Sequence, residues 1–461
     1  MQRHQDNPAA HGGRTDQDGP AARPDLGTAG RSGALSRRRL LRMGAAAGGF
    51  TAAVPLLGAC AEFTSSSSGS GGSGSSGSGT LVAWTYFDQA KLAAGRFMKS
   101  NPDIKIDMQV FPGDNYETKL QLVLGANQNP PDLFDMDADY LGKYIDDFPE
   151  DLTSYGAENL VKDYVPYVSA LGRDSRGRLR GVTDNSSPAG FLYRRSLAKK
   201  YLGIDTPEQL SAQLTQWSDV VTLGREVKKA GGGKVHLIAD YAIIVQDARH
   251  QMDPWVTDKK FTVDPRWNQI LDIARTVYDE GLDAKLEAFS APWGAAWNNA
   301  SVVMFGWPSW AASSNIDPHA TGDDWGLAKG PSPEYEGGRY TFVYKNSPRK
   351  KLAYKYLEFL AGAEWQNYNL QQTQNMPGLK SVFEQNRSTY KPALFGGQPI
   401  LDVYEPIALA IPPRPANPDS ESVEALFNTA VSDGMRAGRT NAQIFDSLKA
   451  AVRSQLPDVK F

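Results

Sequence analysis

The chain has 461 residues, of which 41% are hydrophobic, and its formal net charge at pH 7 is −3. This hydrophobic content suffices for a core, and the roughly 380 residues after position 80 predict one or two large lobes, since a domain usually takes ~100–200 residues. Residues 1–59 hold eight Arg and four Asp but no Lys or Glu. The acidic excess therefore lies in the rest of the chain, which argues against nucleic-acid binding and against a polybasic membrane contact.

The first 59 residues have the layout of an export signal. A basic segment containing Arg37 and Arg38 precedes an uncharged stretch of small residues over 43–59. This order is typical of a cleavable signal peptide, and the stretch is too short to span a bilayer, which takes ~20 mainly apolar residues. The paired arginines resemble a twin-arginine signal. We therefore expect 1–59 to direct export, with a long polar region before the arginines.

The single cysteine, Cys60, follows this stretch directly. The preceding Leu-Gly-Ala resembles the end of a bacterial lipobox, in which the cysteine becomes the first mature residue and carries acyl chains. Every residue from 65 to 79 is Ser or Gly, a composition that behaves as a flexible coil. A buried structural cysteine is the alternative, but the order of these features favours an acylated Cys60 and a linker over 60–79. We expect a lipid-anchored protein on the extracytoplasmic face of the bacterial cell membrane.

Five elements are predicted after the linker. Residues 104–110 alternate apolar and polar side chains with period two, the pattern of a half-buried strand. Strands are also expected over 81–86 and 132–136, with helices over 89–99 and 114–126 between them. The order strand, helix, strand, helix, strand with short links implies a parallel sheet covered by helices.

A second α/β block is predicted after residue 190. Thr206 and Pro207 are residue types favoured at the cap and at the first position of a helix. Another helix is expected from Pro265, with an apolar stripe and a stop at Gly281. The remaining expected elements are strands over 234–239 and 301–305, a helical run over 349–372 broken near Gly362, and a helical tail from Ser420 broken at 438–440.

Several stretches of this layout occur in the order of one known family. They are 97–106, 116–120, 131–135, 181–184, 191–194, the segment 299–306 followed by Trp310, and 438–440. Together they resemble the family 1 extracellular solute-binding proteins of ABC importers, the group that includes maltose-binding protein. The resemblance covers nearly all of 80–455. It departs at Asp-Asn-Ser-Ser over 184–187, where maltose binders place a glutamate, and at the additional tryptophan, Trp307.

The resemblance implies an α/β protein with the two-lobed type II fold of periplasmic binding proteins, each lobe a mixed sheet flanked by helices. Lobe 1 would comprise 80–186 plus 340–378, and lobe 2 187–338 plus 382–455, joined by hinge crossovers. A solute bound between the lobes would favour the closed form. The implied partners are a small-molecule solute, in the first place a mono- or oligosaccharide, and the permease subunits of an ABC importer. A monomer is expected.

Aromatic side chains are the first candidates for a sugar site, because they pack on the apolar face of a sugar ring while amides and carboxylates bond its hydroxyls. Four tryptophans fall between residues 293 and 310. For Trp293 and Trp297, core and cleft are equally good interpretations, since large aromatic residues usually bury. The resemblance favours the cleft for Trp310 and, less so, for Trp307.

Three more aromatic candidates come from other parts of the chain. Trp84 and Tyr86 end the first predicted strand, and strand ends in open α/β sheets face the ligand crevice. Trp255 follows Asp-Pro in a predicted loop, where both cleft and surface stay open.

The polar candidates are spread along the chain. Asp137 is a possible hydroxyl acceptor, with a solvated loop as the alternative. The resemblance places Asp184 and Asn185 at a crossover beside the cleft. Asn375, before Met-Pro-Gly, and Arg414, within Pro-Pro-Arg-Pro, are further candidates, although Pro-rich loops are often only rigid surface.

Sequence signatures of common enzymes are absent. There is no Gly-x4-Gly-Lys-Ser/Thr, no His-Glu-x-x-His and no Gly-x-Ser-x-Gly. We therefore expect a binding protein with no catalytic residue, no metal and no cofactor. Two alternatives stay open: a membrane-anchored enzyme acting on glycosides, which needs only two carboxylates, and a binder of a non-sugar solute such as a polyamine or a phosphate ester.

Overall fold

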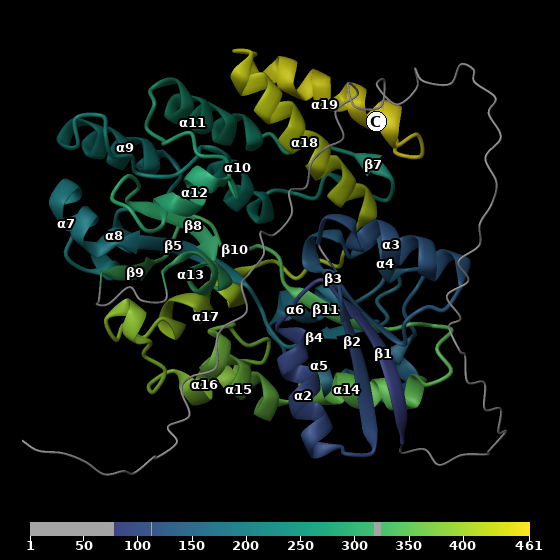
Figure 1. Ribbon diagram of the computed structural model, residues 1–461. Helices are drawn as coiled ribbons and strands as arrows, with labels where there is room; N and C mark the ends of the chain where they lie inside the picture. Colours follow the sequence, from purple (N-terminus) through teal and green to yellow (C-terminus); the bar gives the residue numbers. More distant parts are fainter. Residues whose placement is uncertain (1–77, 112, 318–323) are drawn as a thin grey trace, which may run out of the picture.

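The computed structural model of the protein describes residues 78–111, 113–317 and 324–461 (Figure 1). The predicted export signal with Arg37 and Arg38, the predicted acylation site Cys60 and nearly all of the predicted linker lie outside the described residues. Two larger sheets flanked by helices and one two-stranded sheet make up the described chain, so the fold is α/β as predicted. Across these ranges, no helix combines the length and apolar character needed to cross a membrane.

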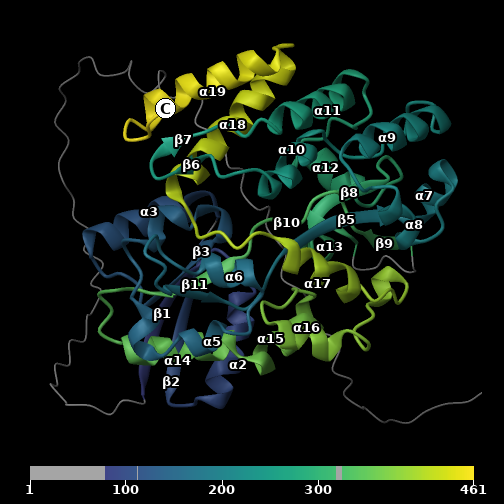
Figure 2. The same ribbon diagram turned by 180° about the vertical axis from the view of Figure 1, so that it is seen from behind.

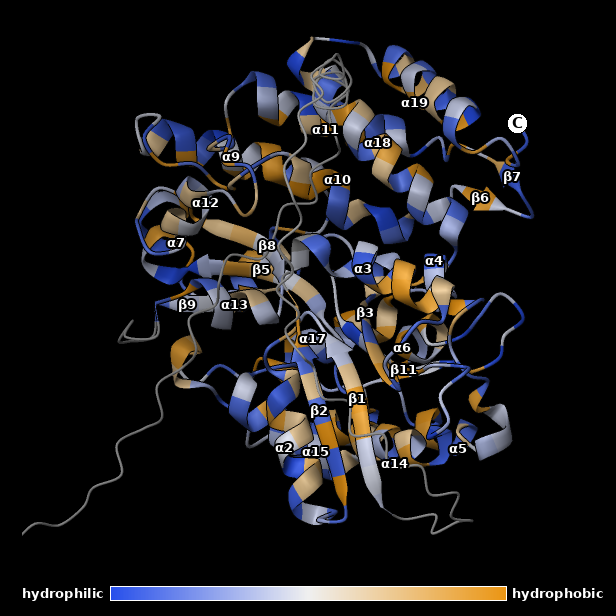
Figure 3. Ribbon diagram, turned by 45° about the vertical axis from the view of Figure 1, so that its right-hand side comes forward, coloured by the Kyte–Doolittle hydropathy of each residue, from blue (hydrophilic) through white to orange (hydrophobic). Residues whose placement is uncertain are grey.

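The first sheet has five strands in the order β2-β1-β3-β11-β4. β1 (Gly79–Thr85) pairs in parallel with β2 (Ile104–Val110) and β3 (Leu133–Asp137), which confirms the three strands expected here. β11 (Arg339–Val343) is antiparallel to both β3 and β4 (Gly181–Thr183), so the sheet is mixed. β2 alternates hydrophobic and hydrophilic residues along its length, as its period-two pattern predicted (Figure 3).

Helices from both ends of the chain cover the first sheet. Phe97 of α2 (Ala90–Ser100) packs on Tyr356 of α14 (Lys350–Ala361) with ring centroids 5.2 Å apart. The predicted break is confirmed at Gly362, which is extended between α14 and α15 (Ala363–Thr373). The other helices on this side are α3 (Gly113–Ala126), η1 (Ala138–Tyr140), α4 (Gly142–Ile145), η2 (Leu152–Tyr155), α5 (Glu158–Val161) and α6 (Pro166–Leu171).

The second sheet is antiparallel and centred on β5 (Pro188–Arg194), which pairs with β8 (Met304–Pro308), β9 (Trp325–Ala328) and β10 (Glu334–Tyr335). The strand expected over 301–305 therefore begins three residues later. The prediction of a strand over 234–239 is wrong, because these residues form no continuous strand. His236 and Ile238 form only isolated bridges, to Val302 and Asp283, and two partners on different segments cannot continue into one ladder.

The helices around the second sheet confirm several local predictions. Thr206 caps α8 with a complete capping box and Pro207 at its first turn. The predicted stripe of α11, which includes Trp267, is buried, and Thr440 caps the last helix after the predicted break. The elements on this side are α7 (Arg195–Leu202), α8 (Pro207–Ala212), α9 (Ser218–Ala230), α10 (Ala242–Ala248), η3 (Arg249–Gln251), the hairpin β6 (Val256–Thr257) and β7 (Lys260–Phe261), α11 (Trp267–Asp279), α12 (Ala291–Ala296), α13 (Trp310–Asn315), α16 (Lys380–Asn386), η4 (Ala393–Phe395), α17 (Leu401–Ala410), α18 (Pro418–Arg436) and α19 (Asn441–Gln455).

Three segments that connect the two sides lie next to one another. The first links β4 to β5, the second links β10 to β11, and the third links α15 to α16. The Ser186 amide donates to the Met376 carbonyl at 2.8 Å, and the Glu336 amide to the Ser187 carbonyl at 3.3 Å. The main chain thus passes between the sheets in one compact bundle.

A second contact between the two sides involves α18, which lies with α10, α11 and α19 at one end of the molecule (Figures 1 and 2). The Gly142 amide of α4 donates to both carboxylate oxygens of Glu421 on α18, at 2.9 and 3.1 Å. A Cβ added at Gly142 would lie 2.5 Å from the backbone nitrogen of Pro418. Only glycine permits this approach of α4 to α18.

Candidate functional site

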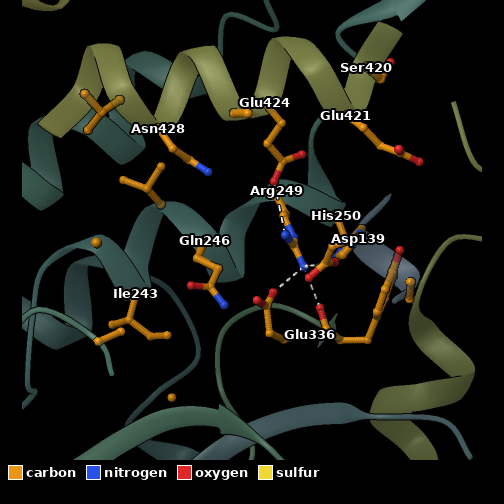
Figure 4. A pocket seen from close by; sticks show the side chains of 18 of the residues that line it. Asp139, Ile243, Gln246, Arg249, His250, Glu336, Ser420, Glu421, Glu424 and Asn428 are labelled. Carbon is orange, nitrogen blue, oxygen red and sulfur yellow. Dashed lines mark hydrogen bonds and ion pairs between the residues drawn. The ribbon is translucent and has the colours of Figure 1, made fainter. Parts of the chain in front are cut away.

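A cavity of about 1010 Å³ lies between the first-sheet side and the second-sheet side of the molecule. η1, which follows β3, supplies Asp139 and Tyr140 to one wall. α10, η3, the end of β10 with the residue after it, and α18 supply the opposite walls (Figure 4). Because η1 belongs to one side and the other elements to the other, a molecule in this cavity contacts both.

Arg249, on η3, lies at the centre of a partly buried charge cluster in this cavity. Its Nε is 2.9 Å from Glu334, and its Nη2 is 2.7 Å from Glu336 and 3.5 Å from Asp139. Its Nη1 is 3.2 Å from Glu424 on α18. One guanidinium therefore holds four carboxylates: two from β10 and the residue that follows it, one from η1 and one from α18. We call Arg249, Glu334, Glu336, Asp139 and Glu424 the Arg249 cluster.

The cluster is strongly perturbed electrostatically. Burial raises the pKa of Glu334 and of Glu336 well above the usual range, and the nearby acidic groups add to this effect. Burial lowers the pKa of the adjacent His250 to about 3, and the Arg249 charge lowers it further in the same direction. His250 is therefore neutral at pH 7, so it adds no positive charge to the cluster.

Aromatic side chains form another part of the wall. The Trp293 and Trp307 rings lie 5.2 Å apart and are almost fully buried. Phe289 packs edge-on against Trp307 at 5.3 Å but is 45% exposed. Its φ is 63°, in the left-handed region that non-glycine residues seldom adopt. Strained conformations of this kind gather at ligand sites, which makes Phe289 the ring best placed to meet a ligand.

Polar groups without a protein partner also face the cavity. Gln246 of α10 and Asn428 of α18 line it, and their side-chain amides point toward it in Figure 4. Neither amide has a hydrogen-bond partner within the described part of the chain. Each offers two donors and an acceptor to a bound molecule. No sequence pattern marked Gln246, Asn428, Phe289 or Arg249, because each owes its position to long-range packing.

Four of the sequence-predicted site residues line the cavity: Trp255, Trp293, Trp307 and Arg414. Trp255 is 4% exposed and packs on Trp267 and Phe427, so it supports the wall from behind. Arg414 donates from Nη1 to the Met252 carbonyl at 2.7 Å. Trp297 is fully buried and stacks on Phe305 at 4.0 Å, which makes it core.

Three other predicted residues lie near the cavity without lining it. Trp310 donates from Nε1 to the Glu336 carbonyl at 3.1 Å and so supports a cluster residue. The Tyr86 hydroxyl donates to Asp137 at 2.9 Å, and the Asp137 carboxylate also accepts from the Asp139 amide. Both side chains therefore fix the start of η1. Burial raises the pKa of Asp137 to about 7.

The remaining predicted residues have structural surroundings. Asp184 accepts from Arg339 and from the Trp365 indole, both at 2.8 Å, and is 3% exposed. Its carboxylate therefore belongs to a buried ion pair rather than to the cavity lining. Trp84 is buried against Phe111. Asn185 lines a small neighbouring void near the crossovers, and Asn375 donates to Gln89 at 3.2 Å.

Among the residues that the structure describes, no group of three or more His, Cys, Asp or Glu side chains is arranged to hold a metal ion. The lining instead combines unpaired amides, carboxylates and an exposed aromatic ring, which suits a polar organic molecule.

Comparison with known proteins adds a family and a fold. A family model described as bacterial extracellular solute-binding protein matches residues 68–367. A solved extracellular solute-binding protein of family 1 aligns with a TM-score of 0.72 at 18% identity, covering 81% of this chain and 99% of its own. The fold of these proteins is the two-lobed one predicted from the sequence. No curated protein sequence matches the chain.

Two further structures show the same fold. The GacH receptor of Streptomyces glaucescens was solved unliganded and with acarbose. It aligns with a TM-score of 0.67 at 18% identity, and the alignment covers 83% of this chain and 100% of the GacH chain. The galacto-N-biose-/lacto-N-biose I-binding protein of an ABC transporter from Bifidobacterium longum, solved with lacto-N-biose, has a TM-score of 0.68 at 16% identity, covering 83% of this chain and 98% of its own.

Proposed function

The chain belongs to the bacterial extracellular solute-binding protein family, and on that premise we propose that it captures a carbohydrate for an ABC importer. A mono- or oligosaccharide binds in the cavity between the two sides of the molecule. The loaded protein then delivers it to the permease subunits in the membrane. Similar structures that hold acarbose or lacto-N-biose support a sugar as the solute class.

The composition of the cavity wall is the observation that carries this proposal. An exposed ring, Phe289, lies beside the buried Trp293 and Trp307, and such a ring can pack on the apolar face of a sugar. The unpaired amides of Gln246 and Asn428 can bond the hydroxyl rim. A volume of about 1010 Å³ is large enough for an oligosaccharide.

Hinge closure supplies the coupling between binding and delivery. We take lobe 1 as 80–186 plus 340–378 and lobe 2 as 187–338 plus 382–455, with the three neighbouring connections as the hinge. Asp139 and Gly142 then lie on one lobe, and Arg249 and Glu421 on the other. Their contacts form only when the lobes approach, so a solute that bridges the lobes shifts the population toward the closed form.

The N-terminal segment holds the receptor near its permease. We propose export directed by Arg37 and Arg38, acylation of Cys60, and attachment of a monomeric receptor to the extracytoplasmic face of the membrane. The Ser/Gly run of ~15 residues spans roughly 20 Å as a flexible coil, which lets the receptor dock and release. Cys60→Ser should yield exported but unlipidated protein in a membrane-fractionation assay. Unchanged membrane attachment of that variant contradicts the anchor.

The test of solute class is a thermal-shift screen of the intact chain against a carbohydrate library. A carbohydrate at 100 times its Kd stabilises the protein by roughly 2.7 kcal/mol, a shift that is easily measured. Saturable stabilisation by a carbohydrate that stays chemically unchanged supports a binding protein. Turnover of that carbohydrate indicates an enzyme, and stabilisation only by a non-sugar solute contradicts the proposed solute class.

A further inference from the structure

The Arg249 cluster has fewer positive than negative charges. Four carboxylates share one guanidinium, and their side chains are between 1% and 27% exposed. The adjacent His250 is bonded to Glu334 and is neutral at pH 7, as described above. Arg414 lines the same cavity but donates to a backbone carbonyl. With these carboxylates ionised, the protein alone leaves this site with an excess of negative charge, and this excess adds to burial in raising the pKa of Glu334 and of Glu336.

Three of these carboxylates each keep one oxygen unpaired. Arg249 contacts Oε2 of Glu336, Oδ1 of Asp139 and Oε1 of Glu424. The second oxygen of each has no hydrogen bond or ion pair within the described residues, whereas both oxygens of Glu334 are used. All three side chains line the cavity and gather around Arg249 in Figure 4. They present acceptors and no donors when ionised.

The surroundings of these oxygens fit an organic cation. An alkylammonium group carries three donors and no acceptor, which matches three unpaired carboxylate oxygens, and such charge-assisted bonds are the strong ones. The rings of His250, Tyr335 and Tyr167 form a continuous stack under the cluster, with centroids 4.3 and 4.9 Å apart. Aromatic faces also attract cations.

We propose that the solute is an amino sugar or another carbohydrate with a protonated amine, and that its ammonium group binds Asp139, Glu336 and Glu424. This inference rests on the proposed carbohydrate function and narrows it. The amides of Gln246 and Asn428 and the ring of Phe289 bind the neutral part of the same molecule. Because the three carboxylates come from both sides of the molecule, the ammonium also holds the two sides together.

Isothermal titration of the intact chain with four probes tests the proposal. They are the chitosan disaccharide, which carries two free amines, its N-acetylated counterpart N,N′-diacetylchitobiose, the hydroxyl counterpart cellobiose, and spermidine. We expect the chitosan disaccharide to bind at least tenfold tighter than either neutral disaccharide. Equal or weaker binding, or no binding at millimolar concentration, overturns the inference. A neutral disaccharide that binds tightest leaves the carbohydrate function standing, whereas binding of spermidine alone contradicts both.

A pair of variants on α18 separates charge recognition from a structural effect. Glu424→Gln keeps the shape but removes one charge of the cluster. It should weaken binding of the chitosan disaccharide at least fivefold and leave a neutral disaccharide within twofold. Asp419→Asn, on the same helix, breaks the ion pair with Lys259, which lies outside the cavity lining, and should change neither affinity. An equal loss for charged and neutral probes in Glu424→Gln overturns the assignment.

Discussion

The contact between α4 and α18 gives the sharpest structural prediction, for the substitution Gly142→Ala. The added methyl group would lie 2.5 to 2.8 Å from three backbone atoms of Asn417 and Pro418, where ordinary contacts need more than 3.4 Å. Backbone atoms cannot rotate away as a side chain does, so α4 and α18 must separate by about 1 Å. Overpacking of this kind costs ~1–3 kcal/mol.

This free-energy cost destabilises the closed form of the protein, because α4 and α18 belong to opposite lobes in our proposal. We therefore expect Gly142→Ala to weaken solute affinity by roughly 5- to 150-fold, since each 1.4 kcal/mol is a factor of ten. The melting temperature of the unliganded protein should change little. Titration calorimetry measures the affinity, and scanning calorimetry measures the melting temperature.

The matched control is Gly125→Ala on α3, where an added Cβ meets nothing within 4 Å. This variant should bind solute as the wild type does and gain up to ~1 kcal/mol of stability, because Ala favours helix over Gly. A Gly142→Ala protein with wild-type affinity and an unchanged melting temperature would refute the coupling between this contact and binding.

Three further predictions concern stability, pH and the aromatic wall. Asp184→Ala should lower the free energy of unfolding by ~3–5 kcal/mol in denaturant titrations, because it leaves Arg339 buried with only one of its two carboxylate partners. Burial raises the pKa of Glu421 from 4.5 to about 8, so the folded state binds this proton more tightly than the unfolded state and loses stability as the pH rises between these values. Glu421→Gln should reduce that loss by up to about 1.4 kcal/mol per pH unit in melts from pH 5 to 8. Phe289→Ala should weaken carbohydrate affinity by roughly 5- to 30-fold, the effect of ~1–2 kcal/mol, while Leu409→Ala, at an equally exposed position outside the cavity lining, should not.

Each of these predictions can fail in its own way. An Asp184→Ala protein as stable as the wild type would show that the buried ion pair is replaceable. Identical pH profiles for wild type and Glu421→Gln would mean that this carboxyl titrates as it does in the unfolded chain. Unchanged affinity in Phe289→Ala would show that the sugar ring does not pack on Phe289.

Local sequence signals predicted eight of the eighteen α-helices in the described residues, among them the long α11, α18 and α19, and the first three strands. Thr206 and Thr440 act through residues three positions away, and Gly362 breaks a helix by its own conformation. Signals of this kind involve only residues within about one helical turn of each other, so they can be recognised in the sequence. The pairing of β11 with β3 joins residues some 200 positions apart, and no local pattern around residue 339 indicates an antiparallel partner.

The candidate site was harder to predict for the same reason. Composition drew attention to the tryptophans near residue 300, of which Trp293 and Trp307 line the cavity and Trp297 is core. The Arg249 cluster assembles from elements up to 285 positions apart, between Asp139 and Glu424, so none of its members stood out. Asp184 was attractive because of its position at a crossover, but its partner Arg339, 155 residues away, determines its role.

The most direct test of the central claim is the affinity of a Gln246→Ala, Asn428→Ala double variant for the carbohydrate that most stabilises the wild type. Both amides line the cavity and have no partner within the described chain, so their removal should leave the melting temperature unchanged. The account predicts saturable one-to-one binding by the wild type and at least a tenfold loss in the double variant. Wild-type affinity in the double variant would contradict carbohydrate capture in this cavity.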